Sequence, residues 1–100
     1  MKLVWSPLAL DRALEVKTFI ASDNPRAAEK WVSGLVNAVA KLKRHSKLGR
    51  VFPEIGREEY RELIYGDYRV VYRASENMTS ILTVRHSSRL FDPAEIVERQ

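Results

Sequence analysis

The sequence has 100 residues, of which 45% are hydrophobic and 30% are charged, and its net charge is +4. This length suits one core, so we expect a single domain over residues 1–100, and the composition excludes an intrinsically disordered chain. The absence of cysteine excludes disulfides and thiolate zinc sites. Because there is neither a long apolar run nor an apolar leader, we expect a cytoplasmic protein without a membrane partner.

The N-terminal part of the sequence predicts a short strand and a first helix. Lys2–Trp5 is rich in apolar residues and indicates the strand. Ser6 is a suitable helix cap, and Pro7 suits the first helical position because proline has no backbone N–H. The apolar residues that follow recur at helical spacing and predict one buried stripe, which comprises Ala9, Ala13, Val16 and Ile20 and is widened by Leu10, Leu14 and Phe19.

The segment Ser22–Pro25 predicts the end of this helix and the start of a longer one. Because only about four residues join the two helices, we expect them to form an antiparallel hairpin. Beyond the second helix, Gly49, Pro53 and Gly56 predict an irregular connection over residues 47–58. The apolar stripe of the second helix comprises Ala28, Trp31 or Val32, Leu35, Val39 and Leu42.

The C-terminal half of the sequence predicts three strands. Tyr60–Tyr65 and Tyr68–Arg73 are runs of apolar and polar residues joined by Gly66-Asp67, a pair that suits a tight hairpin turn. A second polar link leads into Thr79–His86, which is rich in β-branched residues. Three consecutive strands joined by short links predict an antiparallel meander.

The element order β-α-α-β-β-β predicts an α+β fold, in which two N-terminal antiparallel helices cover one face of a small, mainly antiparallel sheet. The first strand then lies at one edge, and the other sheet face remains partly open. A capping pattern over Asp92–Glu95 predicts a short C-terminal helix from Pro93 to Arg99. The residues expected to be buried where the second helix meets the sheet are Leu35, Val39, Val70, Tyr72, Leu82 and Val84.

Basic residues concentrate in two places. Between Lys30 and Pro53 there are six Lys or Arg residues and no acid, which suits nucleic acid, an acidic protein segment or a solvated helix end. A second group on and beside the predicted sheet comprises Arg57, Arg61, Arg69, Arg73, Arg85 and Arg89. Arginine pairs bidentately with carboxylate or phosphate, so these residues predict an anion site unless nearby glutamates neutralise them. For Arg69, central in its strand, we favour the anion site.

His86 ends the last predicted strand beside Arg85. A histidine side chain titrates near neutral pH and can act as a general acid or base, although a histidine at a strand end can also simply bind a backbone group. Neither His86 nor His45 has neighbours at metal-ligand spacing, and no glycine-rich phosphate loop is present. The sequence therefore predicts no metal site and no cofactor.

Several of these segments, taken in order, resemble the ParE/RelE-type toxins, the toxin halves of bacterial type II toxin–antitoxin modules, also known as plasmid stabilisation proteins. The resemblance runs over nearly the whole chain and implies a small sheet with two N-terminal helices on one face. The segments that carry it are Asp23-Asn24-Pro25 with Ala27-Ala28, Gly49-Arg50 to Gly56-Arg57, Arg61-Glu62-Leu63, Tyr68-Arg69-Val70-Val71-Tyr72 and Ile81-Leu82-Thr83-Val84-Arg85-His86.

The resemblance implies one of two activities. RelE-like members are ribosome-dependent mRNA endonucleases that use a basic, phosphate-binding surface and often a tyrosine or histidine at the end of the last strand. ParE-like members share the fold and inhibit DNA gyrase. Arg69 matches an arginine that the nucleases use, but the segment Ser87–Phe91 after His86 contains neither tyrosine nor lysine. The chain is therefore more similar to ParE than to RelE.

We predict a ParE-like toxin that inhibits DNA gyrase by binding it and is not an enzyme. The predicted target-binding or anion-binding residues are Arg61, Arg69, Arg85, His86 and Arg89. The alternative is a metal-independent endonuclease that cleaves mRNA on the ribosome and uses Arg69, His86 and Arg85. A third interpretation is a degenerate toxin that only binds its antitoxin.

The resemblance also implies a cognate antitoxin, with which the chain would form a hetero-oligomer. The helix pair predicts a groove between Asp11–Ser22 and Ala28–Lys43 that accepts an acidic, amphipathic C-terminal segment of the antitoxin. The predicted antitoxin contacts are Lys17, Ile20, Lys30, Lys41, Arg44, Arg69 and Arg73.

Overall fold

The helices and strands of the computed structural model, which describes residues 2–90 and 92–96, follow the predicted order with one additional strand and a 3-10 turn that continues the second helix. They are β1 (Lys2–Trp5), α1 (Pro7–Asp23), α2 (Pro25–Ala40), the 3-10 helix η1 (Lys41–Lys43), β2 (Arg50–Val51), β3 (Tyr60–Tyr65), β4 (Tyr68–Ala74), β5 (Met78–His86) and the 3-10 helix η2 (Pro93–Ile96). The additional strand is β2, which lies in the connection predicted to be irregular. A strand of two residues is too short to show alternation in the sequence.

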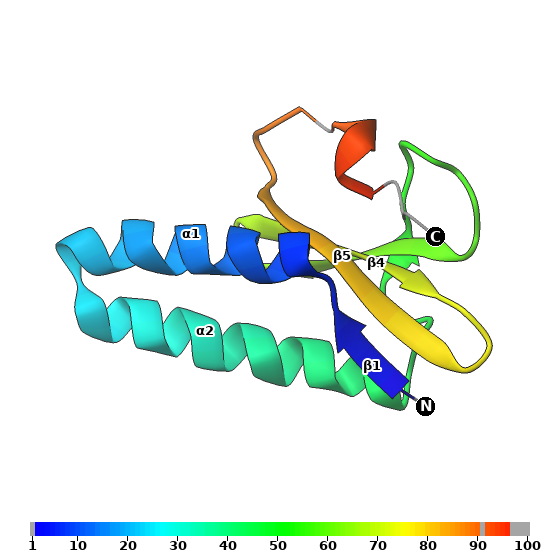
Figure 1. Ribbon diagram of the computed structural model, residues 1–100, viewed down its shortest axis with the longest axis horizontal. Helices are drawn as coiled ribbons and strands as arrows, with labels where there is room; N and C mark the ends of the chain where they lie inside the picture. The colour runs from blue at the N-terminus through cyan, green and yellow to red at the C-terminus, as the bar shows by residue number, and fades with distance from the viewer. Residues whose placement is uncertain (1, 91, 97–100) are drawn as a thin grey trace.

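Both long helices begin at the predicted caps. The Ser6 Oγ accepts a hydrogen bond from the Ala9 backbone N–H at 3.0 Å, and the Asn24 Oδ1 accepts one from the Ala27 N–H at 3.1 Å. Asn24 both ends α1 and caps α2, so the chain reverses within one residue. Figure 1 shows the resulting antiparallel hairpin, whose closed end projects beyond the sheet.

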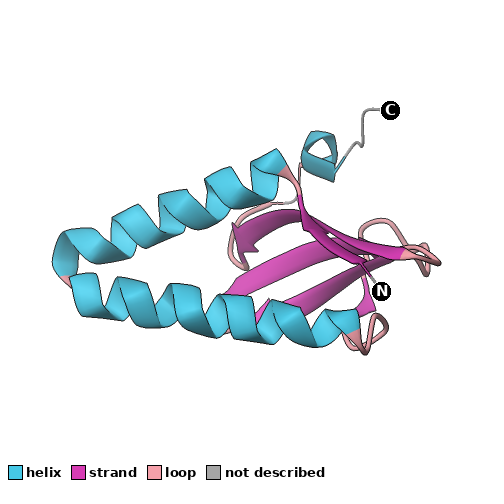
Figure 2. Cartoon of the chain, turned by 60° about the horizontal axis from the view of Figure 1, so that its bottom comes forward, coloured by secondary structure: helices cyan, strands magenta, loops and turns pink. Residues whose placement is uncertain are grey.

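The five strands form one sheet in the order β1-β5-β4-β3-β2. As predicted, β3, β4 and β5 form an antiparallel meander, and β1 lies at an edge, where it pairs in parallel with β5. Gly66 in the β3–β4 turn has a φ of +57°, a left-handed conformation that glycine adopts without strain. In Figure 2 the strands gather at the open end of the helix hairpin. The predicted α+β class is confirmed.

The main core lies between the helices and one face of the sheet. It comprises Ala9, Leu35, Val39, Leu42, Val70, Tyr72, Ile81 and Val84. Five of the six residues predicted for this core are therefore correctly placed. Helix α2 approaches β3 closely at Gly34, where an added Cβ would lie 2.1 Å from the Tyr65 hydroxyl oxygen. That hydroxyl donates a hydrogen bond to the Trp31 carbonyl at 2.9 Å, so glycine at position 34 is required for this contact.

The sixth core prediction, Leu82, is wrong. Val71 of β4 pairs with Thr83 of β5, but the next residue, Tyr72, pairs with Ile81, so Leu82 is an extra residue without a partner in the register. Such a β-bulge interrupts the alternation of side chains along a strand. As a result Ile81 packs toward the helices, whereas Leu82 packs on the opposite face of the sheet.

Ser6 ties the start of α1 to this bulge. Its hydroxyl donates a hydrogen bond to the Leu82 carbonyl at 2.9 Å, and its backbone N–H donates to the Ile81 carbonyl at 2.9 Å. The same hydroxyl oxygen caps α1. One serine therefore joins the parallel edge strand, the first helix and the irregular point of β5.

The face of the sheet away from the helices carries a second, smaller core. Phe52, Val71 and Leu82 are buried there, and Ile55 and Tyr60 pack against them. Phe52 belongs to the connection between β2 and β3, and its backbone N–H donates a hydrogen bond to the Tyr60 carbonyl at 2.8 Å. This connection therefore covers part of the face that the sequence predicted to be open.

Two arginines and two glutamates form an ion-pair network on the same face. The Glu62 side chain is 0% exposed; it accepts a hydrogen bond from Arg50 Nε at 2.5 Å and a short one from Arg69 Nε. The remaining guanidinium nitrogens of Arg69 pair with Glu54 at 3.0 and 3.1 Å, and its guanidinium carbon lies 5.1 Å from the centre of the Phe52 ring. Two glutamates therefore neutralise Arg69, as the alternative interpretation of these arginines predicts.

Helix α1 buries less apolar surface than predicted. Leu10, Leu14 and Phe19 were expected to widen its buried stripe, but they are 54, 60 and 75% exposed. The reason is angular: successive helical residues are about 100° apart, so these side chains lie on the flanks of the stripe that begins at Ala9. Among the described residues, no helix is long and apolar enough to cross a membrane.

The predicted C-terminal helix is present as a shorter element. The 3-10 helix η2 covers Pro93–Ile96, and the remainder of the predicted range, residues 97–99, lies outside the described residues. Asp92 acts as its cap, because Asp92 Oδ1 accepts a hydrogen bond from the Ala94 N–H at 3.0 Å.

Substitution of Leu35 tests the main core. Leu35 is 1% exposed, and Leu35→Ala should lower the free energy of unfolding by about 2–5 kcal/mol, because apolar volume is lost between α2 and the sheet. Its neighbour Val36 is 50% exposed, so Val36→Ala is a control expected to change the free energy by less than about 0.5 kcal/mol. Urea unfolding of both variants measures the difference, and equal losses would contradict the orientation of α2.

Substitution of Arg69 tests the ion-pair network. Arg69→Met should lower the free energy of unfolding by about 3–5 kcal/mol, because the buried Glu62 carboxylate would retain only Arg50. Arg57 provides a matched control, since it also pairs with a glutamate, Glu59 at 2.7 Å, but its side chain is 64% exposed. Arg57→Met should cost less than about 1 kcal/mol in the same urea unfolding experiment.

The pH dependence of unfolding tests the ion pair between Arg69 and Glu54. The hydrogen bond from Arg69 lowers the folded-state pKa of Glu54 below its ordinary value of 4.5. The contribution of this pair is therefore present above pH 4.5 and is lost as the pH falls through the folded-state pKa. Arg69→Met should lose less stability than the wild type between about pH 5 and about pH 3, and equal slopes would show that the pair does not form.

Candidate binding surface

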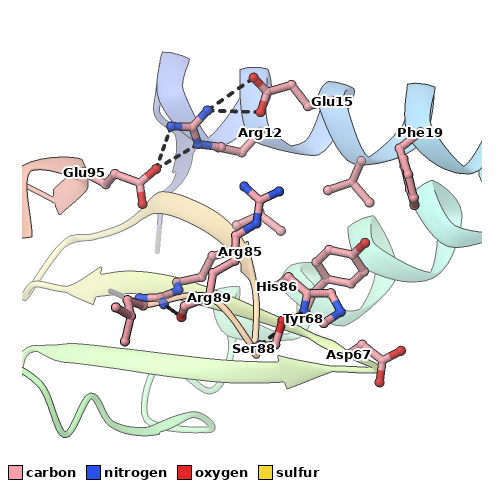
Figure 3. Close-up of a pocket in the computed structure, with 13 residues that line it drawn as sticks. Arg12, Glu15, Phe19, Asp67, Tyr68, Arg85, His86, Ser88, Arg89 and Glu95 are labelled. Atoms are coloured by element: carbon pink, nitrogen blue, oxygen red, sulfur yellow. Dashed lines mark hydrogen bonds and ion pairs between the residues drawn. The ribbon is translucent and has the colours of Figure 1, made fainter. Parts of the chain in front are cut away.

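A cavity of about 630 Å³ lies between α1, the C-terminal end of β5 and the segment that follows β5 (Figure 3). Its walls combine apolar side chains with charged groups of both signs, and none of its lining residues belongs to α2. The lining residues are Arg12, Glu15, Val16, Phe19, Asp67, Tyr68, Val84, Arg85, His86, Ser88, Arg89, Leu90 and Glu95. The cavity therefore brings together three of the predicted site residues with several that the sequence analysis did not single out.

Arg12 closes one side of the cavity. Its guanidinium group pairs with Glu15 on the same helix at 3.0 Å and with Glu95 in η2 at 2.7 Å, as Figure 3 shows. The hydrogen bond to Glu95 is the main reason why the pKa of Arg12 is raised. This ion pair holds the segment after β5 against α1. No local pattern predicts it, because 83 residues separate its two members.

The end of β5 forms the opposite side of the cavity. The His86 ring lies edge-on to Tyr68, with 5.2 Å between the ring centres. His86 Nδ1 accepts a hydrogen bond from the Ser88 backbone N–H at 3.1 Å, so the tautomer with hydrogen on Nε2 is the one that fits. The Arg85 guanidinium donates a hydrogen bond to the Arg89 carbonyl, and burial lowers the pKa of Arg85. Arg85, His86 and Arg89, predicted as one group, all line the cavity, although Arg85 is opposite Arg69 in the register and therefore belongs to the sheet face away from His86.

The apolar part of the cavity has an exposed rim. Phe19 of α1 is 75% exposed and Leu90 is 97% exposed, whereas Val16, Tyr68 and Val84 are half-buried or buried. The sequence predicts that Phe19 widens the buried stripe of α1, whereas the structure places it at the cavity rim. The sequence contains a signal for this position. Phe19 follows Arg12 by seven residues, which places both on the same flank of α1, to one side of Ala9. An exposed aromatic side chain beside a cavity is suited to contact an apolar group of a partner.

Arg69 and His86 lie on opposite faces of the sheet. His86 is directly opposite Tyr68 in the register, on the face that packs against the helices. Arg69 is the next residue along β4, so its side chain points to the other face, where it pairs with Glu54 and Glu62. The structure does not bring together the two residues that the nuclease interpretation places on one phosphate.

The remaining predicted anion-binding arginines are dispersed. Arg61 lies opposite Tyr72 on the helix-facing side of β3 and donates a hydrogen bond to the Gly49 carbonyl at 2.9 Å. Arg73 is on the face away from the helices and lies 3.6 Å from Glu59. Arg61 therefore supports the connection after α2 and does not join Arg69 in one anion site.

The predicted antitoxin contacts fall into separate groups. Lys17 and Lys30 are exposed near the closed end of the helix hairpin, and Ile20 is half-buried between them and the hairpin turn. Lys41 and Arg44 are exposed at the far end of α2, which is about 15 Å away along the helix. Arg69 and Arg73 lie on the opposite sheet face, as described above. Within the described part of the chain, no group of three or more His, Asp or Glu residues is arranged to hold a metal ion.

One comparison with solved structures concerns the fold. The structure described as "Chromosomal ParDE TA system from P. aeruginosa" is similar to this chain with a TM-score of 0.71 and 20% sequence identity. The match covers 86% of this chain and 95% of that chain. A comparison with curated proteins found no match.

A comparison with family patterns covers almost the whole chain. Residues 3–91 match the family described as "ParE toxin of type II toxin-antitoxin system, parDE". This range contains both long helices, all but the first residue of the sheet and most of the cavity lining. The chain therefore belongs to the ParE toxin family of type II toxin–antitoxin systems.

Proposed function

We propose that the chain acts as a toxin by binding DNA gyrase in the cytoplasm, and that a cognate antitoxin neutralises it in a toxin–antitoxin hetero-oligomer. Membership of the ParE toxin family supports the toxin role. The observation that favours binding over RNA cleavage is the separation of Arg69 and His86 by the sheet.

Metal-independent RNA cleavage requires a cation and a proton-transferring group within hydrogen-bond reach of the same phosphate. On the helix-facing side, His86 lies against Tyr68 and has no partner arginine from β4. On the other side, the guanidinium group of Arg69 is occupied by Glu54 and Glu62. Release of Arg69 toward a phosphate would leave the buried Glu62 carboxylate with one cation fewer, which is unfavourable.

The antitoxin proposal is supported by the structural likeness to a ParDE system from P. aeruginosa and by the surface beside α1. Phe19 and the cavity offer an apolar anchor site, and Lys17 of α1 and Lys30 of α2 are exposed cations outside the cavity lining. An amphipathic segment with acidic residues matches both features. Arg69 and Arg73 are less suited to this role, because glutamates lie against both of them.

Two assays with one preparation test the choice of target. The purified chain should inhibit DNA supercoiling by gyrase in a dose-dependent way and should leave ribosome-bound mRNA intact. If the wild type cleaves the mRNA, and His86→Ala slows this cleavage by about 10²–10⁴-fold, the endonuclease interpretation is correct. If the purified chain shows neither activity but still binds the antitoxin, the interpretation as a degenerate toxin is correct.

Substitution of Phe19 tests the antitoxin surface. Phe19→Ala should weaken the complex with the product of the neighbouring antitoxin gene by at least about 10-fold, as expected for an aromatic anchor. Leu48 is 50% exposed in the turn after η1 and does not line the cavity, so Leu48→Ala is a control that should bind normally. Calorimetry should also show a large negative heat-capacity change, which marks apolar burial in coupled folding. Equal affinities of the two variants would exclude the cavity rim as the anchor site.

A further inference from the structure

We propose that the segment Lys41–Arg50, hereafter the basic loop, binds the phosphate backbone of duplex DNA. The loop follows α2 and comprises η1, the turn after it and the first residue of β2. It lies outside the cavity and its lining. The proposal goes beyond the proposed function and does not depend on it.

The positive charge of the whole protein comes from this loop. It contains five of the 17 Lys and Arg residues and none of the 13 Asp and Glu residues. The rest of the chain therefore has 12 cations against 13 anions and a net charge of −1, whereas the whole chain has +4. A cluster of cations on an otherwise balanced protein is the electrostatic feature that attracts a polyanion.

Four of the five cations in the loop are available to a ligand. Lys41, Lys43 and Arg44 are exposed, and none of them forms an ion pair with any residue that the structure describes. Lys47 lies 3.6 Å from Glu58, but both side chains are about three-quarters exposed, and such surface pairs contribute little. Arg50 is the exception, because it pairs with the buried Glu62.

The loop is held in one shape by buried groups. Leu42 is 0% exposed and anchors the 3-10 turn in the main core, so that Lys41 and Lys43 point outward on either side of it. The buried Tyr72 hydroxyl donates a hydrogen bond to the Ser46 carbonyl at 2.8 Å and accepts one from the Gly49 N–H at 2.9 Å. A preformed array of cations loses less entropy on binding than a flexible tail.

The position of α2 accounts for only part of this charge. Cations stabilise the C-terminal end of a helix dipole, but the effect falls off within the last turn. The last turn of α2 contains no basic residue, and Arg44 and Lys47 lie beyond the helix. Lys41, which caps α2, and Lys43, in the last turn of η1, are the cations of the loop that the dipole explains.

The loop suits nucleic acid better than an acidic peptide. An amphipathic acidic helix needs an apolar groove for its other face. All ten residues of the loop are described, and Leu48 is the one large apolar side chain that the loop exposes. Contacts to phosphate, by contrast, need only exposed Lys and Arg side chains and a surface free of nearby acids.

Fluorescence anisotropy with a labelled duplex of about 20 base pairs and unrelated sequence tests the proposal. The purified full chain should bind the DNA duplex, and log Kd should change linearly with log salt between about 50 and about 200 mM, with a slope of about 3–4 for four contacts. Arg44→Glu should weaken binding several-fold and reduce the slope by about 1. Arg26 is an exposed arginine at the start of α2, near the hairpin turn, so Arg26→Glu is a control with the same charge change and should retain the wild-type slope.

Each other result overturns the proposal. Absence of binding at about 50 mM salt, or equal losses in Arg44→Glu and Arg26→Glu, would show that the loop does not bind phosphate. Binding to an RNA duplex of the same sequence and not to DNA would overturn the DNA assignment. Binding to a polyglutamate peptide and to neither duplex would make the loop a site for acidic protein. If circular dichroism shows that Arg44→Glu does not fold, Lys43→Glu replaces it.

Discussion

The bulge at Leu82 is the constraint on which the arrangement of both sheet faces depends. Without the extra residue, strict alternation would turn Leu82 toward the helices together with Val84 and would turn Ile81 away from them. With it, Ile81 completes the main core, and Leu82 completes the small core below Phe52. The Leu82 carbonyl is in turn the acceptor for the Ser6 hydroxyl, so the same irregularity positions the start of α1.

The two faces of the sheet consequently have different physical characters. On the helix-facing side, the aromatic rings of Tyr65, Trp31, Tyr68 and His86 contact one another in series and lead to the cavity beside α1. On the other side, charged groups are closely paired around the buried carboxylate of Glu62. On this second face two glutamates pair with Arg69, and Arg85 lies opposite Arg69 in the register. Among the described residues, the surfaces that we consider suited to a partner are the cavity rim and the basic loop.

Local sequence signals were sufficient for most of the fold. Ser6 and Asn24 each cap a helix through a backbone N–H three residues away, and the Gly66 turn depends on one backbone conformation, so a short segment is enough to predict each of them. The bulge at Leu82 could not be predicted from the sequence, because it depends on how β4 and β5 are aligned with each other and not on a local pattern. The candidate site was predicted in part. Arg85, His86 and Arg89 are neighbours in sequence, whereas the Arg12–Glu95 pair that completes the cavity joins opposite ends of the chain.

The hydroxyl group of Tyr72 has a consequence for how this protein can diverge. By position Tyr72 is an ordinary core residue of β4, and phenylalanine would fill the same volume. Its hydroxyl, however, donates a hydrogen bond to the Ser46 carbonyl and accepts one from the buried Gly49 N–H. Substitutions that packing alone would tolerate are therefore excluded by hydrogen bonding in a distant segment. The evolutionary history of position 72 should accordingly follow that of residues 46–49 more closely than that of its core neighbour Val70.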